Sequence, residues 1–428
     1  MAKNYGKGDV TWFQDARFGM FIHWGLYALP ARHEWIRNYE KINDADYQKY
    51  FDHFNPDMFN PKEWARAARE AGMKYFVITT KHHEGFCLWD TKYTDYKITN
   101  TKFGRDALRE VVDAFRSEGL HVGFYYSLID WHHPEFTIDR IHPLRESEAA
   151  RAENKNRDMK KYAKYMRDQV TELLTQFGKI DVIWFDFSYP GEDGKSHKDW
   201  ESEKLVKLIR KLQPQIMIDN RLDLEGSEDF VSPEQYVPVD GMRDEKGNLL
   251  VWEGCQTFSG SWGYHRDENT WKSSRMLIEM LINHICKGGN LLLNVGPTAR
   301  GILDYRAMDR LQAMGAWMKF HSRAVYGCTI APKGMVPPED CRYTYNPETN
   351  CLYVHIFAWP FKALHLPGMA GKVKYAQLLN DASEIKMRDE KTDIHAALNA
   401  KTPSKALTLE LPTVQPNVEV PVIELFLK

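Results

Sequence analysis

Residues 74–128 contain KYFVITT (74–80), then GRDALREVVDAFRSEG (104–119), then HVGFYYSL (121–128). The first and last runs are short and apolar on both faces, whereas the middle run repeats its apolar residues at the spacing of one helix face. Strands that are apolar on both faces are typical of a parallel sheet whose outside is covered by helices. The stretch therefore predicts one strand, one crossover helix and a second, parallel strand.

The same alternation continues on both sides of this unit. A strand is predicted at 17–24 and a helix at 61–72 before it; after it, strands are predicted at 180–187, 215–221 and 290–296, and helices at 155–178, 201–213, 273–289 and 309–322. Strands alternating with helices indicate an α/β fold. The length of the alternation favours a (β/α)8-like barrel over an open sheet.

After about Ser322 the pattern changes. Five strand-like segments follow with turns between them, namely CLYVHIFAW (351–359), ALHLPG (363–368), KVKYAQLL (372–379), ALTLELP (406–412) and VPVIELFLK (420–428). Short strands without helices predict an antiparallel β-sandwich. We therefore expect a barrel over residues 1–325 and a C-terminal β-sandwich domain over residues 326–428.

The charge balance excludes some classes of partner. Lys and Arg total 57 against 59 Asp and Glu, a formal charge of −2, so nothing favours binding to nucleic acid or to an anionic membrane surface. Aromatic residues make up 13% of the chain, which suits stacking on flat apolar ligand faces, although core packing uses the same residues. A neutral or small substrate fits this composition better.

The cysteines and the first residues bear on compartment and cofactors. Six cysteines are scattered without a CxxC pair, so neither a zinc knuckle nor a disulfide framework is predicted, and reduced thiols are expected. The first residues, MAKNYGKGDVTWFQDARFG, lack a hydrophobic stretch of signal-peptide length, and no run of about 18 apolar residues occurs. We therefore expect a cytoplasmic protein, unless a leader has been removed, and these features predict no cofactor.

Polar residues gather where the predicted strands end. In an α/β barrel the active site forms at the carboxyl ends of the strands and in the loops that follow. The candidates there are His23 and Trp24, with Glu34 and Trp35 in the next loop, then His82 and His83, Tyr125 and Tyr126, Trp184 and Asp186, Asn220 and Arg221, and finally Glu234, Glu253 and Trp262.

Asp186 is the most informative of these residues. It ends IDVIWFDF (180–187), whose other members should be buried, and an ionised carboxylate in such a place is costly unless it is paired or used. Pairing with Arg221 is a purely structural alternative. Glu234 or Glu253 supplies the second carboxylate that glycoside hydrolysis requires, although a chain with 59 acidic residues has many such pairs.

The adjacent His82 and His83 admit several interpretations. Neighbouring residues of a strand point to opposite faces, so they chelate one metal only if the strand has already ended. KHHEGF (81–86) lacks the i, i+4 spacing of a helical zinc site. Beside tryptophans and tyrosines, the two rings look more like hydrogen-bond partners for hydroxyl groups, with a structural role open for one of them.

Seven motifs together resemble one known family. They are RFGMFIHWGLYALP (17–30), HEW (33–35), KHHEGFCLWDTKYTDY (81–96), GFYYSLIDWHHP (123–134), VIWFDF (182–187), WEGCQTFSGSWGY (252–264) and KGGNLLLNVGPTARG (287–301). In this order and at these distances they resemble the α-L-fucosidases of glycoside hydrolase family 29, over about residues 12–317.

The resemblance implies a (β/α)8-like barrel with a C-terminal β-sandwich, no metal, and hydrolysis of α-L-fucosides from a fucosylated oligosaccharide or glycan with retention of configuration. Retention implies a covalent glycosyl-enzyme. The family's nucleophile falls on Asp186, and its fucose-binding positions fall on His23, Glu34, Trp35, His82, His83, Tyr126, Trp184 and Arg221. Trp184 and Trp262 are candidates for an apolar wall against the methyl group of fucose.

The acid/base is less clearly assigned, because family members place it differently. Glu234, in DFVSPEQYVP (229–238), lies in a Pro-flanked loop that can reach a leaving group, whereas Glu253 follows Trp252 in a strand-like run. We therefore expect Glu234 to be the acid/base, with Glu253 as the second candidate.

Two other functions stay open at this stage. One is a metal-dependent barrel isomerase or hydrolase whose ligands are His23, His82, His83 and Asp186. The other is a non-catalytic fucose-binding protein, against which the two carboxylate candidates argue.

Overall fold

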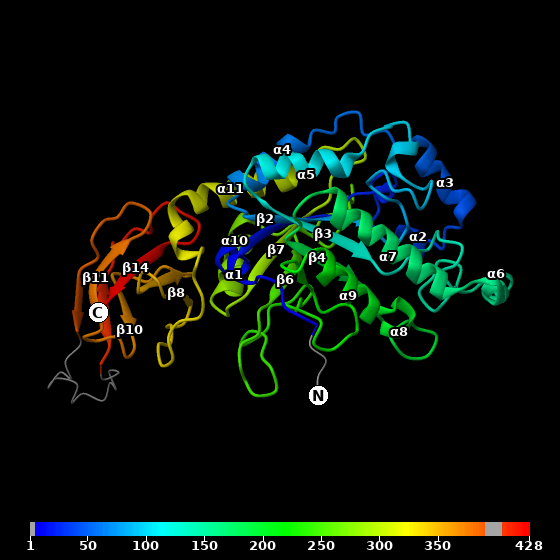
Figure 1. Cartoon of the computed structure of the whole chain (residues 1–428). Coiled ribbons are helices and arrows are strands. Elements are labelled where there is room, and N and C mark those ends of the chain that lie inside the picture. The colour runs from blue at the N-terminus through cyan, green and yellow to red at the C-terminus, as the bar shows by residue number, and fades with distance from the viewer. Residues whose placement is uncertain (1–4, 390–404) are drawn as a thin grey trace.

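The computed structural model describes residues 5–389 and 405–428 and divides into a helix-covered parallel sheet and a smaller antiparallel part (Figure 1). The first four residues, MAKN, belong to the segment on which the predicted cytoplasmic location rests and lie outside the described residues. In the described part of the chain, no helix is long and apolar enough to cross a membrane.

Seven parallel strands form the larger sheet in the order β5-β4-β3-β2-β1-β7-β6. They are buried along almost their whole length, as expected for strands covered on both faces. Their bounds are β1 Phe18–Ile22, β2 Tyr75–Lys81, β3 His121–Ser127, β4 Val182–Asp186, β5 Met217–Ile218, β6 Glu253–Thr257 and β7 Asn290–Val295.

An irregular segment, residues 229–235, closes the sheet between β5 and β6. Its backbone hydrogen-bonds to Ile218 on one side at 2.7 Å and to residues 251–255 on the other. Its bridges to β6 and to the residue before it are parallel, at Glu234 with Cys255 and at Val231 with Trp252. This segment therefore occupies the place of an eighth strand, and it carries Glu234.

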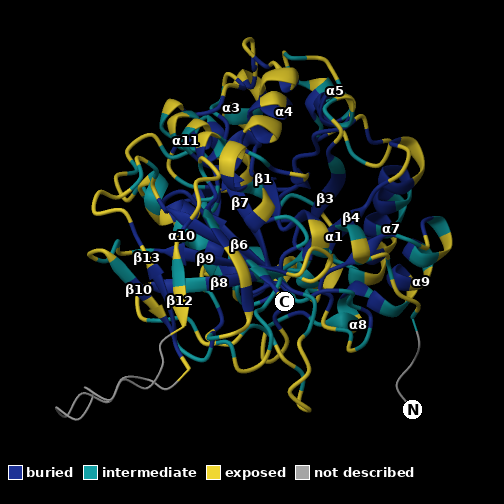
Figure 2. Cartoon of the chain, turned by 90° about the vertical axis from the view of Figure 1, so that its left-hand side faces the viewer, coloured by how far each residue is buried: buried dark blue, intermediate teal, exposed yellow. Residues whose placement is uncertain are grey.

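Helices surround the sheet and turn their apolar faces inward (Figure 2). Several begin at an Asp or Ser side chain that accepts a backbone N–H of the first turn, as at Asp106, Asp158, Ser273 and Asp304. The helices are α1 Thr11–Ala16, α2 Ile36–Tyr39, α3 Asp44–His53, α4 Pro61–Glu70, α5 Ala107–Ser117, α6 Glu148–Ala152, α7 Met159–Gln176, α8 His197–Trp200, α9 Ser202–Leu212, α10 Ser274–Ile285 and α11 Tyr305–His321, with short 3-10 turns at η1 Leu26–Ala28, η2 Ile98–Asn100, η3 Glu153–Asn156 and η4 Ser322–Ala324.

Two antiparallel sheets form the C-terminal part. One has the order β11-β14-β9-β8 and the other β10-β13-β12. Leucines, valines and isoleucines of both sheets meet in a separate apolar core, which is the packing expected of a sandwich. The strands are β8 Cys341–Asn346, β9 Cys351–Ile356, β10 Ala363–Leu366, β11 Val373–Leu378, β12 Met387–Asp389, β13 Leu407–Glu410 and β14 Val422–Leu427.

The two parts share buried contacts. The indole nitrogen of Trp317 on α11 donates to the carbonyl of Val420 at 2.9 Å, and Arg323 pairs with the buried Glu424 at 2.7 Å. The predicted α/β barrel and β-sandwich are confirmed. The domain limits of 1–325 and 326–428 stay a prediction.

Candidate active site

A pocket opens at the carboxyl ends of the parallel strands. Most of the residues predicted to form a site line it. The lining side chains are Phe21, His23, Glu34, Trp35, His82, His83, Tyr125, Trp184, Asp186, Phe187, Glu234, Cys255 and Trp262.

Asp186 ends β4 and is held by two donors. Arg221 donates from Nη1 to Oδ1 at 2.9 Å, and the hydroxyl of Tyr125 donates to Oδ2 at 2.8 Å. Burial raises the pKa of Asp186 to about 6, and the positive charge of Arg221 opposes that rise. Asp186 is therefore mostly ionised near neutral pH.

Glu234 is the second carboxylate of the pocket. Arg221 donates to it from Nη2 at 3.0 Å, so one guanidinium holds both carboxylates. The same guanidinium lies over the ring of Trp184 at 4.6 Å from its centroid. The side chain of Glu234 is 42% exposed, against 14% for Asp186. Glu234 thus reaches towards solvent while Asp186 lies deeper.

His23 is fixed in one tautomer. Asn294 donates from Nδ2 to the carbonyl of Trp262 at 2.6 Å, so its Oδ1 is left to accept from Nδ1 of His23, also at 2.6 Å. Burial lowers the pKa of His23 to about 3, which makes the ring neutral. The second ring nitrogen, Nε2, is therefore an acceptor.

His82 and His83 both line the pocket because β2 ends at Lys81 and the chain then turns. Gly85 closes this turn with φ +86°, and its N–H donates to the carbonyl of His82 at 3.0 Å. A side chain on Gly85 would stand 2.3 Å from Asp130, so the tight turn requires glycine.

The neighbours of His83 fix its tautomer as well. The hydroxyl of Ser127 donates to the carbonyl of Ile129 at 2.8 Å and so accepts from Nδ1 of His83 at 2.6 Å. Nε2 of His83 then carries no proton and is an acceptor; it lies 3.9 Å from Oδ2 of Asp186. Burial lowers the pKa of both His82 and His83 well below its usual range.

Glu34 offers the pocket a buried carboxyl group. Gly263 donates its N–H to Oε2 at 2.8 Å, and burial raises the pKa of Glu34 to about 7. His33 lies 3.2 Å from Oε1, but its Nδ1 already accepts the N–H of Trp35. Within residues 5–389 and 405–428, Oε1 of Glu34 and Nδ1 of His82 have no hydrogen-bond partner.

The position predicted for Tyr126 is corrected by the structure. Tyr126 packs between the sheet and the helices, where its hydroxyl donates to Gln169 on α7 at 2.7 Å. Its neighbour Tyr125 points into the barrel and lines the pocket. The physical reason is the alternation of side chains along β3, which sends adjacent residues to opposite faces.

Glu253 lies deeper in the barrel than the pocket lining. It begins β6 and is fully buried, with Trp184 donating from Nε1 to its Oε1 at 3.3 Å and Tyr75 donating to its Oε2. Burial raises the pKa of Glu253 to about 7. The ring of Trp184 separates this carboxyl group from Arg221.

Sequence reasoning missed Phe187 and Asn294, and it named Tyr125 as a candidate but assigned the fucose-binding position to Tyr126. Tyr125 and Phe187 line the pocket, and Asn294 orients both His23 and Trp262. A signal for Asn294 was present, since it is a polar residue within the apolar run NLLLNV (290–295). Among the residues that the structure describes, no group of three or more His, Cys, Asp or Glu is arranged to hold a metal ion.

A family model described as Alpha-L-fucosidase matches residues 6–323 of this chain. The chain belongs to the α-L-fucosidase family. It is a glycoside hydrolase, and the family resemblance seen in its motifs is confirmed.

Individual α-L-fucosidases agree with this assignment. The plasma α-L-fucosidase of Rattus norvegicus is 30% identical over 376 residues, which cover 82% of this chain and 78% of that protein. The structure of α-L-fucosidase isoenzyme 1 from Paenibacillus thiaminolyticus is 46% identical, with a TM-score of 0.91 and 98% of each chain covered.

A third relative bears on mechanism. The GH29 α-L-fucosidase of Bacteroides thetaiotaomicron, solved as a trapped covalent intermediate with 2-fluoro-fucosyl fluoride, is 30% identical, with a TM-score of 0.83 and coverage of 100% of this chain and 98% of that one.

Proposed function

We propose that this α-L-fucosidase removes terminal α-L-fucosyl residues with retention of configuration, with Asp186 as nucleophile and Glu234 as acid/base. The observation that carries the proposal is the sharing of Arg221, which bonds the carboxylates of Asp186 and Glu234 with two nitrogens of one guanidinium. Two carboxylates bonded to one guanidinium lie near each other, which favours the short separation of a retaining enzyme over the wider one that an inverting enzyme needs for its water.

The steps follow from the two carboxylates. Asp186 attacks the anomeric carbon and forms an ester, while protonated Glu234 gives its proton to the glycosidic oxygen, which leaves as an alcohol. Glu234 then takes a proton from water, whose oxygen attacks the same carbon, and Asp186 departs as a carboxylate. Glu234 suits this exchange because its side chain is part-exposed. This position favours it over Glu253, which is fully buried.

The rest of the pocket suits a single sugar unit. Nε2 of His23 and of His83 are acceptors for sugar hydroxyls, and Oε1 of Glu34 is free to pair with another. Leaving such buried polar atoms unpaired costs about 1 to 3 kcal/mol each, so a sugar lacking one hydroxyl is disfavoured strongly. Trp184 and Trp262 offer apolar surface for the methyl group.

Replacement of the nucleophile tests the proposal. Asp186→Gly should lose nearly all turnover of 4-nitrophenyl α-L-fucoside, and added azide should restore part of it and yield the fucosyl azide of opposite configuration. Asp193→Gly, on the same loop, is the matched control and should keep its activity. Turnover like that of the unmodified enzyme in Asp186→Gly would refute the assignment.

A substrate panel tests the alternatives. Release of 4-nitrophenol from the α-L-fucoside, but not from the β-D-galactoside or α-L-rhamnoside, and with no effect of EDTA, is expected. Strong inhibition by EDTA would favour the metal-dependent alternative. The cytoplasmic location stays a prediction, which fractionation of expressing cells tests.

A further inference from the structure

The residue after Asp186 has an unusual backbone. Phe187 has φ +78°, which is rare for a bulky side chain and persists only where the surroundings hold it. Its ring lines the pocket and packs against Trp35 and His83, with centroids 5.1 and 5.2 Å away. Something must therefore fix the loop that begins here.

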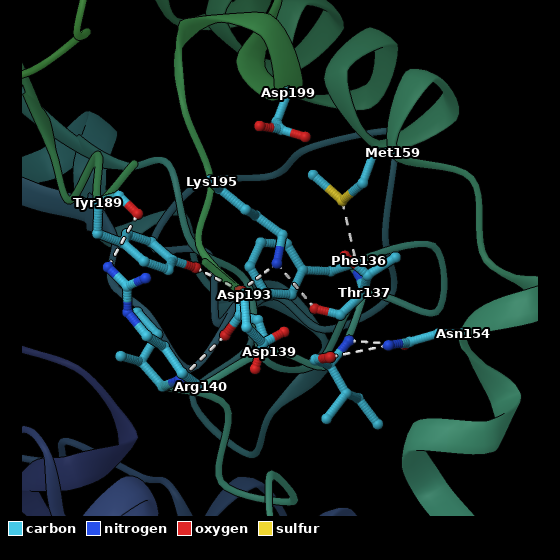
Figure 3. A network of polar contacts seen from close by, with 12 residues as sticks. Phe136, Thr137, Asp139, Arg140, Asn154, Met159, Tyr189, Asp193, Lys195 and Asp199 are labelled. Carbon is cyan, nitrogen blue, oxygen red and sulfur yellow. Dashed lines mark hydrogen bonds and ion pairs between the residues drawn. The ribbon is translucent and has the colours of Figure 1, made fainter. Parts of the chain in front are cut away.

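Two residues of this loop pair through their backbones, and their side chains both donate to the same carboxylate. Tyr189 and Lys195 exchange backbone hydrogen bonds of 2.9 and 3.1 Å. The hydroxyl of Tyr189 donates to Oδ2 of Asp139 at 2.6 Å, and the ammonium group of Lys195 donates to the same oxygen. Figure 3 shows both side chains converging on Asp139, which belongs to the loop after β3.

This cluster lies inside the protein. The side chains of Lys195 and Asp139 are each 4% exposed, and the ammonium group also donates to the carbonyl of Thr137 at 3.0 Å and lies 4.2 Å from the ring centroid of Phe136. Separating a buried ion pair is costly because each charge would be left without its partner. The loop after β4 is therefore anchored to the loop after β3 from within.

We propose that Asp139, Lys195 and Tyr189 are positioning residues, which fix Phe187 as a wall of the fucose pocket; the proposal rests on the proposed function of that pocket. The ring of Tyr189 packs against Phe187 with centroids 5.6 Å apart. The cluster thus acts through Tyr189 on Phe187, and through Phe187 on the rings that face the sugar. A wall contacts ground state and transition state alike, so loosening it weakens binding more than turnover.

Two variants test the proposal, each measured well below its melting temperature. Lys195→Met removes the buried cation, and Tyr189→Phe removes one hydroxyl and keeps the ring. In Lys195→Met, KM for 4-nitrophenyl α-L-fucoside and the inhibition constant of free L-fucose should rise together by about tenfold, with a smaller change in kcat. Tyr189→Phe should raise both by about threefold, because it removes one hydrogen bond to Asp139 and leaves the ion pair with Lys195 in place.

A matched control is the exposed ion pair between Arg151 of α6 and Asp193 of the same loop. Arg151 pairs with Asp193 at 2.6 Å, but these side chains are 36% and 37% exposed. Arg151→Ala should leave KM and the inhibition constant of fucose unchanged. A lowered melting temperature with unchanged KM and inhibition constant in Lys195→Met and Tyr189→Phe would overturn the proposal. Should Lys195→Met fail to fold, the milder Tyr189→Phe decides.

Phe187→Ala separates this proposal from the proposed function. If the inhibition constant of fucose rises in Phe187→Ala but not in Lys195→Met or Tyr189→Phe, the positioning proposal alone is wrong. If Phe187→Ala leaves that constant unchanged, fucose does not bind against this wall, and both the proposal and the assignment of the pocket fail.

Discussion

Arg221 donates a hydrogen bond of 2.9 Å to Asp186, and its positive charge opposes the rise in the pKa of that carboxyl group that burial causes. In Arg221→Met the pKa of Asp186 should therefore rise above its value of about 6. Because only the carboxylate attacks, the acid limb of kcat/KM against pH should move up by about one pH unit or more.

Arg221→Lys separates charge from geometry in this experiment. Lysine keeps the positive charge but cannot bond Asp186 and Glu234 through one planar fork. Its acid limb should lie closer to that of the unmodified enzyme, with a lower kcat. An acid limb at the same pH in Arg221→Met would contradict the assignment of that limb to Asp186.

Glu234→Ala should separate substrates by leaving group. Without the acid, a poor leaving group must depart as an alkoxide, whereas 4-nitrophenolate needs no proton. We expect kcat/KM for a fucosyl disaccharide to fall by about 10²–10⁴-fold and that for the 4-nitrophenyl fucoside by far less. The same pattern in Glu253→Ala but not in Glu234→Ala would exchange the two roles.

The adjacent tyrosines of β3 provide a matched pair. Tyr125→Phe removes the 2.8 Å hydrogen bond to Asp186, and since a bond to a charged group contributes about 1.5–3 kcal/mol, kcat/KM should fall by about 10- to 100-fold. Tyr126→Phe removes a hydroxyl that bonds Gln169 behind the sheet. It should lower thermal stability and leave kcat/KM within about twofold. A large loss of kcat/KM would instead mean that Tyr126 contributes to the active site.

These tyrosines also mark the limit of what the sequence predicts. Strands, helices and the polar residues at strand ends follow from local patterns, so His23, His82 and Asp186 could be found from the chain alone. Which of two adjacent tyrosines faces inward depends on the register of β3, which shifts against β2 between Thr79 and Lys81. This register shift cannot be predicted from the local sequence pattern.

Long-range contacts set a similar limit. Residues 229–235 read as a polar loop, yet their backbone closes the barrel by hydrogen bonds to Ile218 and to residues 251–255. Glu234 reaches Arg221 only because of that closure. The pairing of His23 with Asn294, 271 positions away, is equally invisible to local pattern.

Glu253→Gln should change how stability depends on pH. In the folded protein the pKa of Glu253 is raised by burial from 4.5 to about 7. As pH rises from about 4.5 to 7, the unfolded carboxyl group ionises while the folded one keeps its proton, so this group lowers the free energy of unfolding by up to about 3 kcal/mol. Glutamine does not titrate, so the Glu253→Gln variant does not lose this part of its free energy of unfolding as the pH rises.

The measurement is the melting temperature of Glu253→Gln minus that of the unmodified enzyme, which should increase from pH 4.5 to pH 8. Taking this difference removes the contributions of Glu34 and Glu84, whose pKa values burial raises in the same direction. Glu245→Gln, on the exposed surface, is the control and should show no such trend. A difference that stays constant over this range would mean that Glu253 is ionised in the folded protein throughout. An ionised Glu253 could not act as the general acid, which must carry a proton before the reaction begins.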